Sequence, residues 1–181
     1  EQAVRSMGYL NARVTRDERV RRNRLRLRYE VHPGERYHVR NLDVDIQDSA
    51  LQHQLAEANA LPRLSEGMKF DLNVLDEERG RISSVLANRG YYRFNKDFIR
   101  FEADTTVGHH QVDLLMKVLP YNITPARDTI LHNRYRIHEV TYQVDTTRTG
   151  RPFLRQRALR EASRLEPGNI YREQDVQETY A

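Results

Sequence analysis

The sequence contains no cysteine, so it has neither a disulfide framework nor a thiolate metal site. This absence fits an oxidising compartment such as the periplasm, although many cytosolic domains share it. The sequence also lacks any apolar run near the ~20 residues that a membrane-spanning helix needs, and its N-terminus has no signal-like apolar segment. Because helical patterns stand at both ends, we expect a piece of a longer polypeptide.

A strong excess of one charge sign is also missing. The 181 residues carry 30 basic and 26 acidic side chains, which gives a net charge of +4. Arginine supplies most of the basic side chains, and it suits carboxylate pairing and exposed strand faces. So small an excess does not indicate a nucleic-acid partner. With 38% hydrophobic residues, the chain builds several thin cores more readily than one thick core.

Catalytic arrangements are absent as well. The serines at 83–84 lie in a helical pattern without the turn that exposes a nucleophile, and the 8 glycines form no phosphate-binding loop. Of the 7 histidines, His109 and His110 are neighbours in a turn, and adjacent strand residues face opposite ways. No third ligand is placed beside them by the sequence. We therefore expect no enzyme activity, no cofactor and no metal site.

What the sequence does contain is a helix-to-strand junction, in which Gly90 ends a helical pattern and two tyrosines follow. A weaker copy of this junction stands around Gly8, 82 residues earlier. We interpret Gly90, Tyr91 and Tyr92 as a structural motif, because glycine permits a left-handed backbone and the aromatics can cover the end of a core. The spacing suits small domains in series.

The segment from 35 to 120 predicts the order strand, helix, helix, strand, strand. Its first strand changes phase between Val39 and Leu42, which indicates a bulge. The predicted elements are a strand at 37–46, a helix capped by Asp48 or Ser49, a helix from Asp71 to Gly90, a strand at 92–104, a turn around Gly108 and a strand at 112–118.

Partial copies flank this segment. Residues 1–33 predict a helix end and a β-hairpin, with a charged turn at 16–22 and one half-buried face formed by Leu25, Leu27, Tyr29 and Val31. After a linker around 124–128, the run 134–140 aligns with 36–42, phase slip included. This copy continues with a predicted strand at 134–144 and a helix near 153–164. A glycine turn at 168–171, which matches 67–70, and the start of a last helix follow.

The sequence therefore predicts an α+β protein of tandem repeats. Residues 1–33 form the C-terminal part of a first repeat and 34–121 a complete repeat. A linker at 122–133 leads to the N-terminal part of a third repeat at 134–181. A repeated phase irregularity is stronger support for this reading than repeated hydrophobicity alone.

One ordered set of features runs along the sequence: the Val31-to-Gly34 turn, Tyr37 and its strand, the 67–70 turn, the helix that ends at Gly90 with its two tyrosines, and a hairpin. This set resembles POTRA domains. These are periplasmic modules of the Omp85 superfamily, which includes BamA-like and TamA-like outer-membrane proteins. The resemblance implies a β-α-α-β-β fold, with two helices packed on a three-stranded mixed sheet. It also implies a role in outer-membrane protein assembly, on the periplasmic side of a Gram-negative outer membrane.

The resemblance implies binding rather than catalysis. Expected partners are unfolded or extended outer-membrane or surface client proteins, accessory lipoproteins, and the outer membrane itself through a β-barrel outside this sequence. An extended segment would add to a sheet edge, and the strand after Gly90 is the expected edge. The candidate partner-binding residues along it are Phe94, Asn95, Lys96, Phe98, Arg100 and Glu102.

Three alternatives stay open from the sequence. The phenylalanines of the expected edge could instead pack under the helices or against the next repeat. The repeats could belong to a two-partner-secretion or cell-division protein. An RNA-binding α+β module is a further alternative, although no Gly-x-x-Gly loop lies between the two helices and the charge is nearly balanced.

Overall fold

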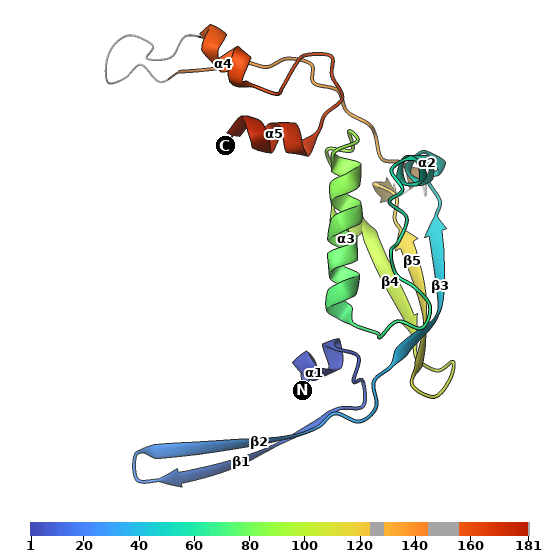
Figure 1. The fold of residues 1–181 in the computed structure, drawn as a ribbon, viewed down its shortest axis with the longest axis vertical. Coiled ribbons are helices and arrows are strands. Elements are labelled where there is room, and N and C mark those ends of the chain that lie inside the picture. Colours follow the sequence, from blue (N-terminus) through green and yellow to red (C-terminus); the bar gives the residue numbers. More distant parts are fainter. Residues whose placement is uncertain (124–128, 145–155, 181) are drawn as a thin grey trace. The chain divides into compact units, whose positions relative to one another are not determined.

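The computed structural model describes residues 1–123, 129–144 and 156–180 (Figure 1). Contacts within the chain divide it into two compact units. The first unit comprises Glu1–Ile46, Pro62–Arg79 and Ile99–Val118. The second comprises Gln47–Leu61, Gly80–Phe98 and Leu119–Ala181. The division runs through helix α3, Leu72–Ala87.

The first unit begins with helix α1, Gln2–Ser6, followed by a hairpin of strands β1, Arg13–Arg21, and β2, Arg24–His32. The predicted turn at 16–22 is wrong, because the strands pair as far as Arg21 and Arg24. Arg22 takes a left-handed φ of 53° and Asn23 completes a two-residue turn, which suits Asn and the twist of a hairpin. Charged residues can occupy β1 because nearly all of its side chains are exposed.

The apolar residues of β2 differ from the prediction in their burial. Leu25, Leu27, Tyr29 and Val31 alternate along the strand as expected. They are not half-buried, however, since each is 44–59% exposed. Strand alternation was therefore readable from the sequence, whereas burial depends on what packs against the strand.

A three-stranded mixed sheet is the centre of the first unit (Figure 1). Strand β5, Gln111–Val118, lies between β3, His38–Ile46, and β4, Ile99–Asp104. It pairs in parallel with β3 and antiparallel with β4. The predicted bulge is confirmed, because the β3 register shifts between Val39 and Asn41. The bulged residue Arg40 reaches across to β5, where its Nε donates to Asp113 at 2.8 Å.

The core of the first unit follows from the alternation of β5. Val112, Leu114, Met116 and Val118 are buried, as their period of two predicts. A cluster of buried residues joins this face to β3, to the 67–70 turn and to the first turns of α3. Its members are Val39, Phe70, Leu75, Val112 and Leu114. The sheet is thus covered here by Leu75 of α3.

The second unit contains helix α2, Ser49–Glu57, and the last turns of α3. Of the two predicted caps, Asp48 and Ser49, the structure uses Asp48, whose carboxylate accepts the N–H groups of Ala50 and Leu51 at 2.9 and 3.3 Å. Arg89 joins the two helices, since its Nη1 lies 3.2 Å from both Gln54 and Glu57. The helix residues Leu51, Leu55, Ile82 and Leu86 are all fully buried.

The predicted strand at 92–104 is too long at its start. Residues 92–95 form a turn and loop, and Lys96–Phe98 form a short 3-10 helix, η1, before β4 begins at Ile99. Asn95 explains the difference, because its side-chain oxygen accepts the N–H of Asp97 at 2.8 Å. Such local side-chain bonds favour a turn over an extended chain.

The remaining elements belong to the second unit. They are strands β6, Asn122–Ile123, and β7, Thr129–Ile130, and helices α4, Gln156–Ala162, and α5, Glu173–Tyr180. Residues 124–128 of the predicted linker and 153–155 of the predicted helix lie outside the described part. The predicted strand at 134–144 is not formed as such: Arg136 makes a single bridge with Ile170. Among the described residues it has no strand like β5 beside it.

Candidate functional site

Strand β4 forms one edge of the three-stranded sheet. The strand order β3-β5-β4 leaves its far side without a partner strand among the described residues. Ile99 is fully buried, whereas Arg100 and Glu102 are exposed on the opposite face. The strand is short, but it contains neither proline nor a bulge. It therefore offers a regular main chain to a further strand.

The direction of the main-chain groups on β4 follows from its pairing. In an antiparallel pair, residues alternate between pointing their N–H and C=O groups at the partner and pointing them away. The N–H of Leu119 donates to the carbonyl of Phe98 at 2.8 Å, so the main-chain groups of Phe98 are directed toward the β5 side of the pair. By the register of the pair, the groups of Phe101 and Ala103 then point away from β5. These two residues present the unpaired main chain.

Arg79 covers the beginning of this edge. Its Nε donates to the carbonyl oxygen of Ile99 at 2.8 Å, and its Nη1 contacts Asp76 at 3.0 Å. The contact agrees with the register, because Ile99 is also a residue whose main-chain groups point away from β5. The open part of the edge therefore begins at Phe101.

The opposite edge of the sheet, β3, is less open. Its first residues are paired with the turn at 67–70: Val39 donates to Met68 at 2.9 Å and accepts from Gly67 at 2.7 Å. Further along, the bulge and the acidic residues Asp43 and Asp45 follow. Bulges and charges are features that discourage edge pairing. Of the two edges, β4 is the better suited to accept a strand.

A second arrangement surrounds Gly90, in the second unit. Gly90 has a φ of 101°, which L-residues rarely adopt, and its carbonyl accepts the N–H of Tyr135 at 2.7 Å. A Cβ on Gly90 would lie 2.7 Å from a side-chain carbon of Arg134 and 2.9 Å from one of Ile170. The glycine therefore ends its helix and also receives the backbone of a later segment.

The first unit repeats this arrangement around Gly8. Gly8 has a φ of 92°, and its carbonyl accepts the N–H of Tyr37 at 2.9 Å. A Cβ there would lie only 2.0 Å from the carbonyl oxygen of Phe70. The next bond also recurs, since Phe70 donates to Tyr37 at 2.9 Å and Tyr171 donates to Tyr135 at 3.0 Å. Two separate parts of the chain thus contain the same type of junction.

Comparison with known proteins agrees with this description. The structure resembles the crystal structure of Haemophilus influenzae BamA POTRA3-5, with a TM-score of 0.57 and 16% sequence identity. The match covers 98% of this chain and 64% of that one.

The chain has the POTRA fold.

Its β3-α2-α3-β4-β5 order and three-stranded mixed sheet confirm the predicted α+β class. Two further structures are more distant. BamA from Haemophilus ducreyi lacking POTRA domains 1-3 has a TM-score of 0.41 and 19% identity over 65% of this chain and 20% of that one. POTRA1-2 of the periplasmic domain of Omp85 from Anabaena has a TM-score of 0.38 and 16% identity, over 79% and 73%.

No family model and no curated protein matches this sequence. The POTRA fold is therefore supported by structure and not by sequence similarity. The chain spans 64% of the length of the BamA fragment that it resembles. Within the described residues, no helix is both long enough and apolar enough to span a bilayer.

The structure separates the six candidate partner-binding residues of the POTRA repeat into two groups. Arg100 and Glu102 lie on the exposed face of β4, where Glu102 pairs with Lys117 at 2.7 Å. Asn95 and Lys96 are exposed but precede the strand. Phe94 and Phe98 also precede it, and their rings contact each other at a centroid distance of 5.5 Å.

His132 packs against both phenylalanines, with ring centroids 4.8 Å from Phe94 and 4.5 Å from Phe98. Its Nε2 lies 3.0 Å from the carbonyl oxygen of Leu119. Burial lowers the pKa of His132 below its ordinary value. Phe94 and Phe98, expected at the edge, therefore form a ring cluster with His132 in the segment that follows β5. Both phenylalanines precede β4, and their contact residue His132 lies in the predicted linker.

The two tyrosines of the junction differ in their surroundings. Tyr91 is buried, and this burial raises the pKa of its hydroxyl. Tyr92 is 58% exposed, yet its ring makes edge contacts with Tyr135 at 6.0 Å and Tyr171 at 5.0 Å. The ring of Tyr92 therefore contacts residues that follow the predicted linker.

Sequence reasoning missed the main-chain donors of the edge, Phe101 and Ala103. Their side chains share the parity of the buried Ile99, so the hydrophobic pattern assigns them to the core face. In a strand, however, the direction of the main-chain groups is set by pairing and not by side-chain polarity. Only the register with β5 identifies these residues.

Proposed function

We propose that the complete POTRA repeat binds extended polypeptide segments by adding them as a strand to the open edge of β4. The observation that carries this proposal is the pair of outward-facing main-chain groups at Phe101 and Ala103. An added strand satisfies such groups, and main-chain bonds accept many sequences. The proposal gives the repeat a binding role without a catalytic step.

The exposed side chains beside this edge would set which segments bind best. Arg100 and Glu102 stand on the solvent face of β4, next to the row that an added strand would occupy. Opposite charges across neighbouring strands stabilise pairing, and like charges oppose it. We therefore propose clients with alternating apolar and polar residues, as in strands of outer-membrane proteins.

This binding role supports a wider proposal for the whole protein. We propose a periplasmic module of an outer-membrane assembly or translocation factor of the Omp85 type. Its partners would be unfolded client proteins and accessory lipoproteins. The support is the POTRA fold, which the chain shares with a BamA fragment, together with an edge suited to extended chains.

Two substitutions at one position test the edge directly. Ala103→Pro removes the N–H that faces the open side, while the ladder with β5 keeps its bonds. Ala103→Val keeps that N–H and favours a strand. The probe is a synthetic peptide with the sequence of one outer-membrane barrel strand, titrated into the 15N-labelled chain and followed by NMR.

We expect the peptide to shift the amide signals of Phe101 and Ala103 in the native chain. Ala103→Val should bind within about twofold of the native affinity, and Ala103→Pro at least tenfold more weakly. The thermal unfolding midpoints should confirm that both variants fold. Equal binding by the proline variant, or shifts confined to the other sheet edge, would contradict the proposal.

Photo-crosslinkers locate the contact in the assembled protein. Placed at Arg100 and Glu102, they should capture client polypeptides, whereas one at Gln52 of α2, which is exposed, serves as the control. Crosslinkers at Asn95 and Lys96 test whether contact begins before β4. Capture at Gln52 equal to that at Glu102 would show non-specific contact and would argue against the edge.

A further inference from the structure

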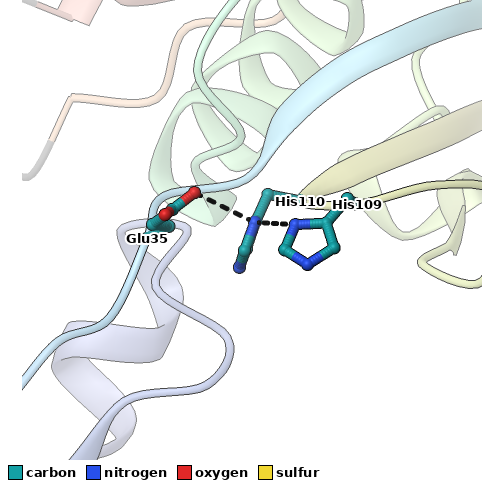
Figure 2. A group of neighbouring side chains, drawn as sticks. All are labelled: Glu35, His109 and His110. Carbon is teal, nitrogen blue, oxygen red and sulfur yellow. Dashed lines mark hydrogen bonds and ion pairs between the residues drawn. The ribbon is translucent and has the colours of Figure 1, made fainter.

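Three side chains converge where the β4–β5 turn meets the segment that leads into β3 (Figure 2). Glu35 comes from that segment, and His109 and His110 come from the turn. His110 Nδ1 lies 3.1 Å from the Glu35 carboxylate and 2.7 Å from Nδ1 of His109. All three potential ligand atoms lie within 4.8 Å of one another.

The backbone explains why two adjacent histidines share one side. His110 has a φ of 54°, a left-handed conformation that interrupts strand alternation. Its carbonyl accepts the N–H of His38 at 3.0 Å, and its ring stands edge-on to Tyr37 at 5.2 Å. His110 is therefore held in place by the start of β3. The sequence expectation that the pair faces opposite ways does not apply at this position.

The hydrogens of this group cannot all be well placed. Each imidazole Nδ1 carries at most one hydrogen, and an ionised carboxylate carries none. If His110 Nδ1 donates its hydrogen to Glu35, it has neither a second hydrogen nor a lone pair for the contact with His109 Nδ1. If His109 donates to His110 instead, the His110 lone pair faces the Glu35 carboxylate at 3.1 Å. A cation among the three atoms would attract every lone pair.

We infer that Glu35, His109 and His110 form a binding site for a divalent transition-metal ion such as Zn²⁺. Two imidazole nitrogens and a carboxylate oxygen are a ligand set that zinc accepts, with water completing a tetrahedron. Bond lengths of about 2.0–2.1 Å place tetrahedral ligand atoms about 3.3 Å apart. The spacings of 2.7 and 3.1 Å are close to this value. The third pair, Glu35 and His109, lies within 4.8 Å, and both side chains are exposed and can move to complete the site.

Bound metal would join two parts of the first unit. Glu35 is two residues before Tyr37, whose N–H is bonded to Gly8, while the histidines belong to the sheet. The ion would tie the approach to β3 to the β4–β5 turn. Since a ligand that binds only the folded state stabilises it, Zn²⁺ should raise the unfolding temperature.

The test is calorimetric titration of ZnCl₂ into the 181-residue chain, free of added histidines. Glu35→Gln and His109→Ala remove exposed ligands, and His110→Asn keeps a residue that tolerates the left-handed backbone. We expect one site in the native chain and at least tenfold weaker binding in each variant. His138→Ala, at an exposed histidine that is not one of the three ligands, should bind as the native chain does.

A thermal measurement gives the second readout. Zn²⁺ should raise the unfolding midpoint of the native chain and of His138→Ala, and should leave that of His109→Ala unchanged. The inference is overturned if no saturable binding is found. It is equally overturned if Glu35→Gln and His109→Ala bind Zn²⁺ as tightly as the native chain, because the heat would then come from other histidines.

Discussion

The carbonyl oxygen of Gly90 accepts the main-chain N–H of Tyr135 at 2.7 Å, and Gly8 accepts that of Tyr37 at 2.9 Å. In each case the acceptor follows a helix and the donor opens a segment that the sequence predicts to be the start of a repeat. Each junction is thus made by main-chain groups around a left-handed glycine. Side chains there can vary while the connection stays the same.

This relationship predicts a large cost for a side chain at Gly90. Gly90→Ala must place a Cβ within 3 Å of carbons in Arg134 and Ile170 and also accept a left-handed φ. Gly168 has a similar φ of 90° but nothing within 4 Å of the added atom. Gly168→Ala therefore isolates the conformational cost of about 1 kcal/mol.

We expect Gly90→Ala to lose about 1–3 kcal/mol of unfolding free energy beyond Gly168→Ala, the range for overpacked sites. Urea unfolding of both variants measures the difference. Gly8→Ala should cost at least as much as Gly90→Ala, because its Cβ would meet a backbone oxygen at 2.0 Å rather than movable side-chain carbons. Equal losses at Gly90 and Gly168 would mean that the contacts at Gly90 relax freely.

The glycine junction and the bulge were readable from sequence because their signals are local. A glycine that needs positive φ and a phase slip at Val39 act through the residues beside them. The partners of those residues are not local. That Gly90 meets Tyr135 and Ile170 depends on chain segments far away in sequence. The sequence located the junction, but only the fold identified what it joins.

The same distinction explains the errors at the edge. The aromatic alternation at Phe94 and Phe98 imitates a strand, yet a ring cluster with His132 holds both before β4 begins. Likewise, Glu35 lies far in sequence from His109, so no spacing rule could have joined them. Pairing register and cluster formation are tertiary properties, and these set the candidate sites.

Leu75 provides a test of the packing between α3 and the sheet in the first unit. It is 5% exposed and belongs to the cluster with Val112 and Leu114. Leu75→Ala should cost about 2–4 kcal/mol, the usual loss for a buried leucine. Leu72→Ala, at a position on the same helix that is 48% exposed, should stay within about 0.5 kcal/mol. Similar losses would show that Leu75 is not a core residue.

His132 predicts a pH dependence of stability. Burial lowers its folded pKa below the ordinary 6.5, whereas the unfolded chain keeps the ordinary value. The unfolded state therefore binds a proton first as the pH falls. The contribution of His132 to the free energy of unfolding is fully present above pH 6.5 and declines as the pH falls from there toward the folded pKa.

Unfolding in urea at pH 7.5 and pH 5.5 checks this expectation for the native chain and for His132→Gln. The glutamine amide can still donate to the Leu119 carbonyl but does not titrate in this range. We expect a smaller loss of stability at the lower pH in the variant. An identical loss of stability in His132→Gln and in the native chain would show that another group causes the pH dependence.

Arg79 leads to a prediction about the length of the open edge. Its Nε occupies the Ile99 carbonyl at 2.8 Å, so an added strand cannot use that acceptor. Arg79→Met would free the carbonyl while keeping an apolar stem of similar length. If strand addition occurs at β4, one more main-chain bond becomes available, worth about 0.5–1.5 kcal/mol. The barrel-strand peptide should then bind several-fold more tightly.

Peptide titration measures this change, and Arg79→Lys serves as the matched control because lysine retains a charge and a hydrogen-bond donor. Adding Ala103→Pro to Arg79→Met should weaken binding relative to Arg79→Met alone, since both changes act on one edge. Equal binding by the double variant and by Arg79→Met would place the peptide outside β4. Weaker binding by Arg79→Met alone would instead assign Arg79 a direct contact with the peptide.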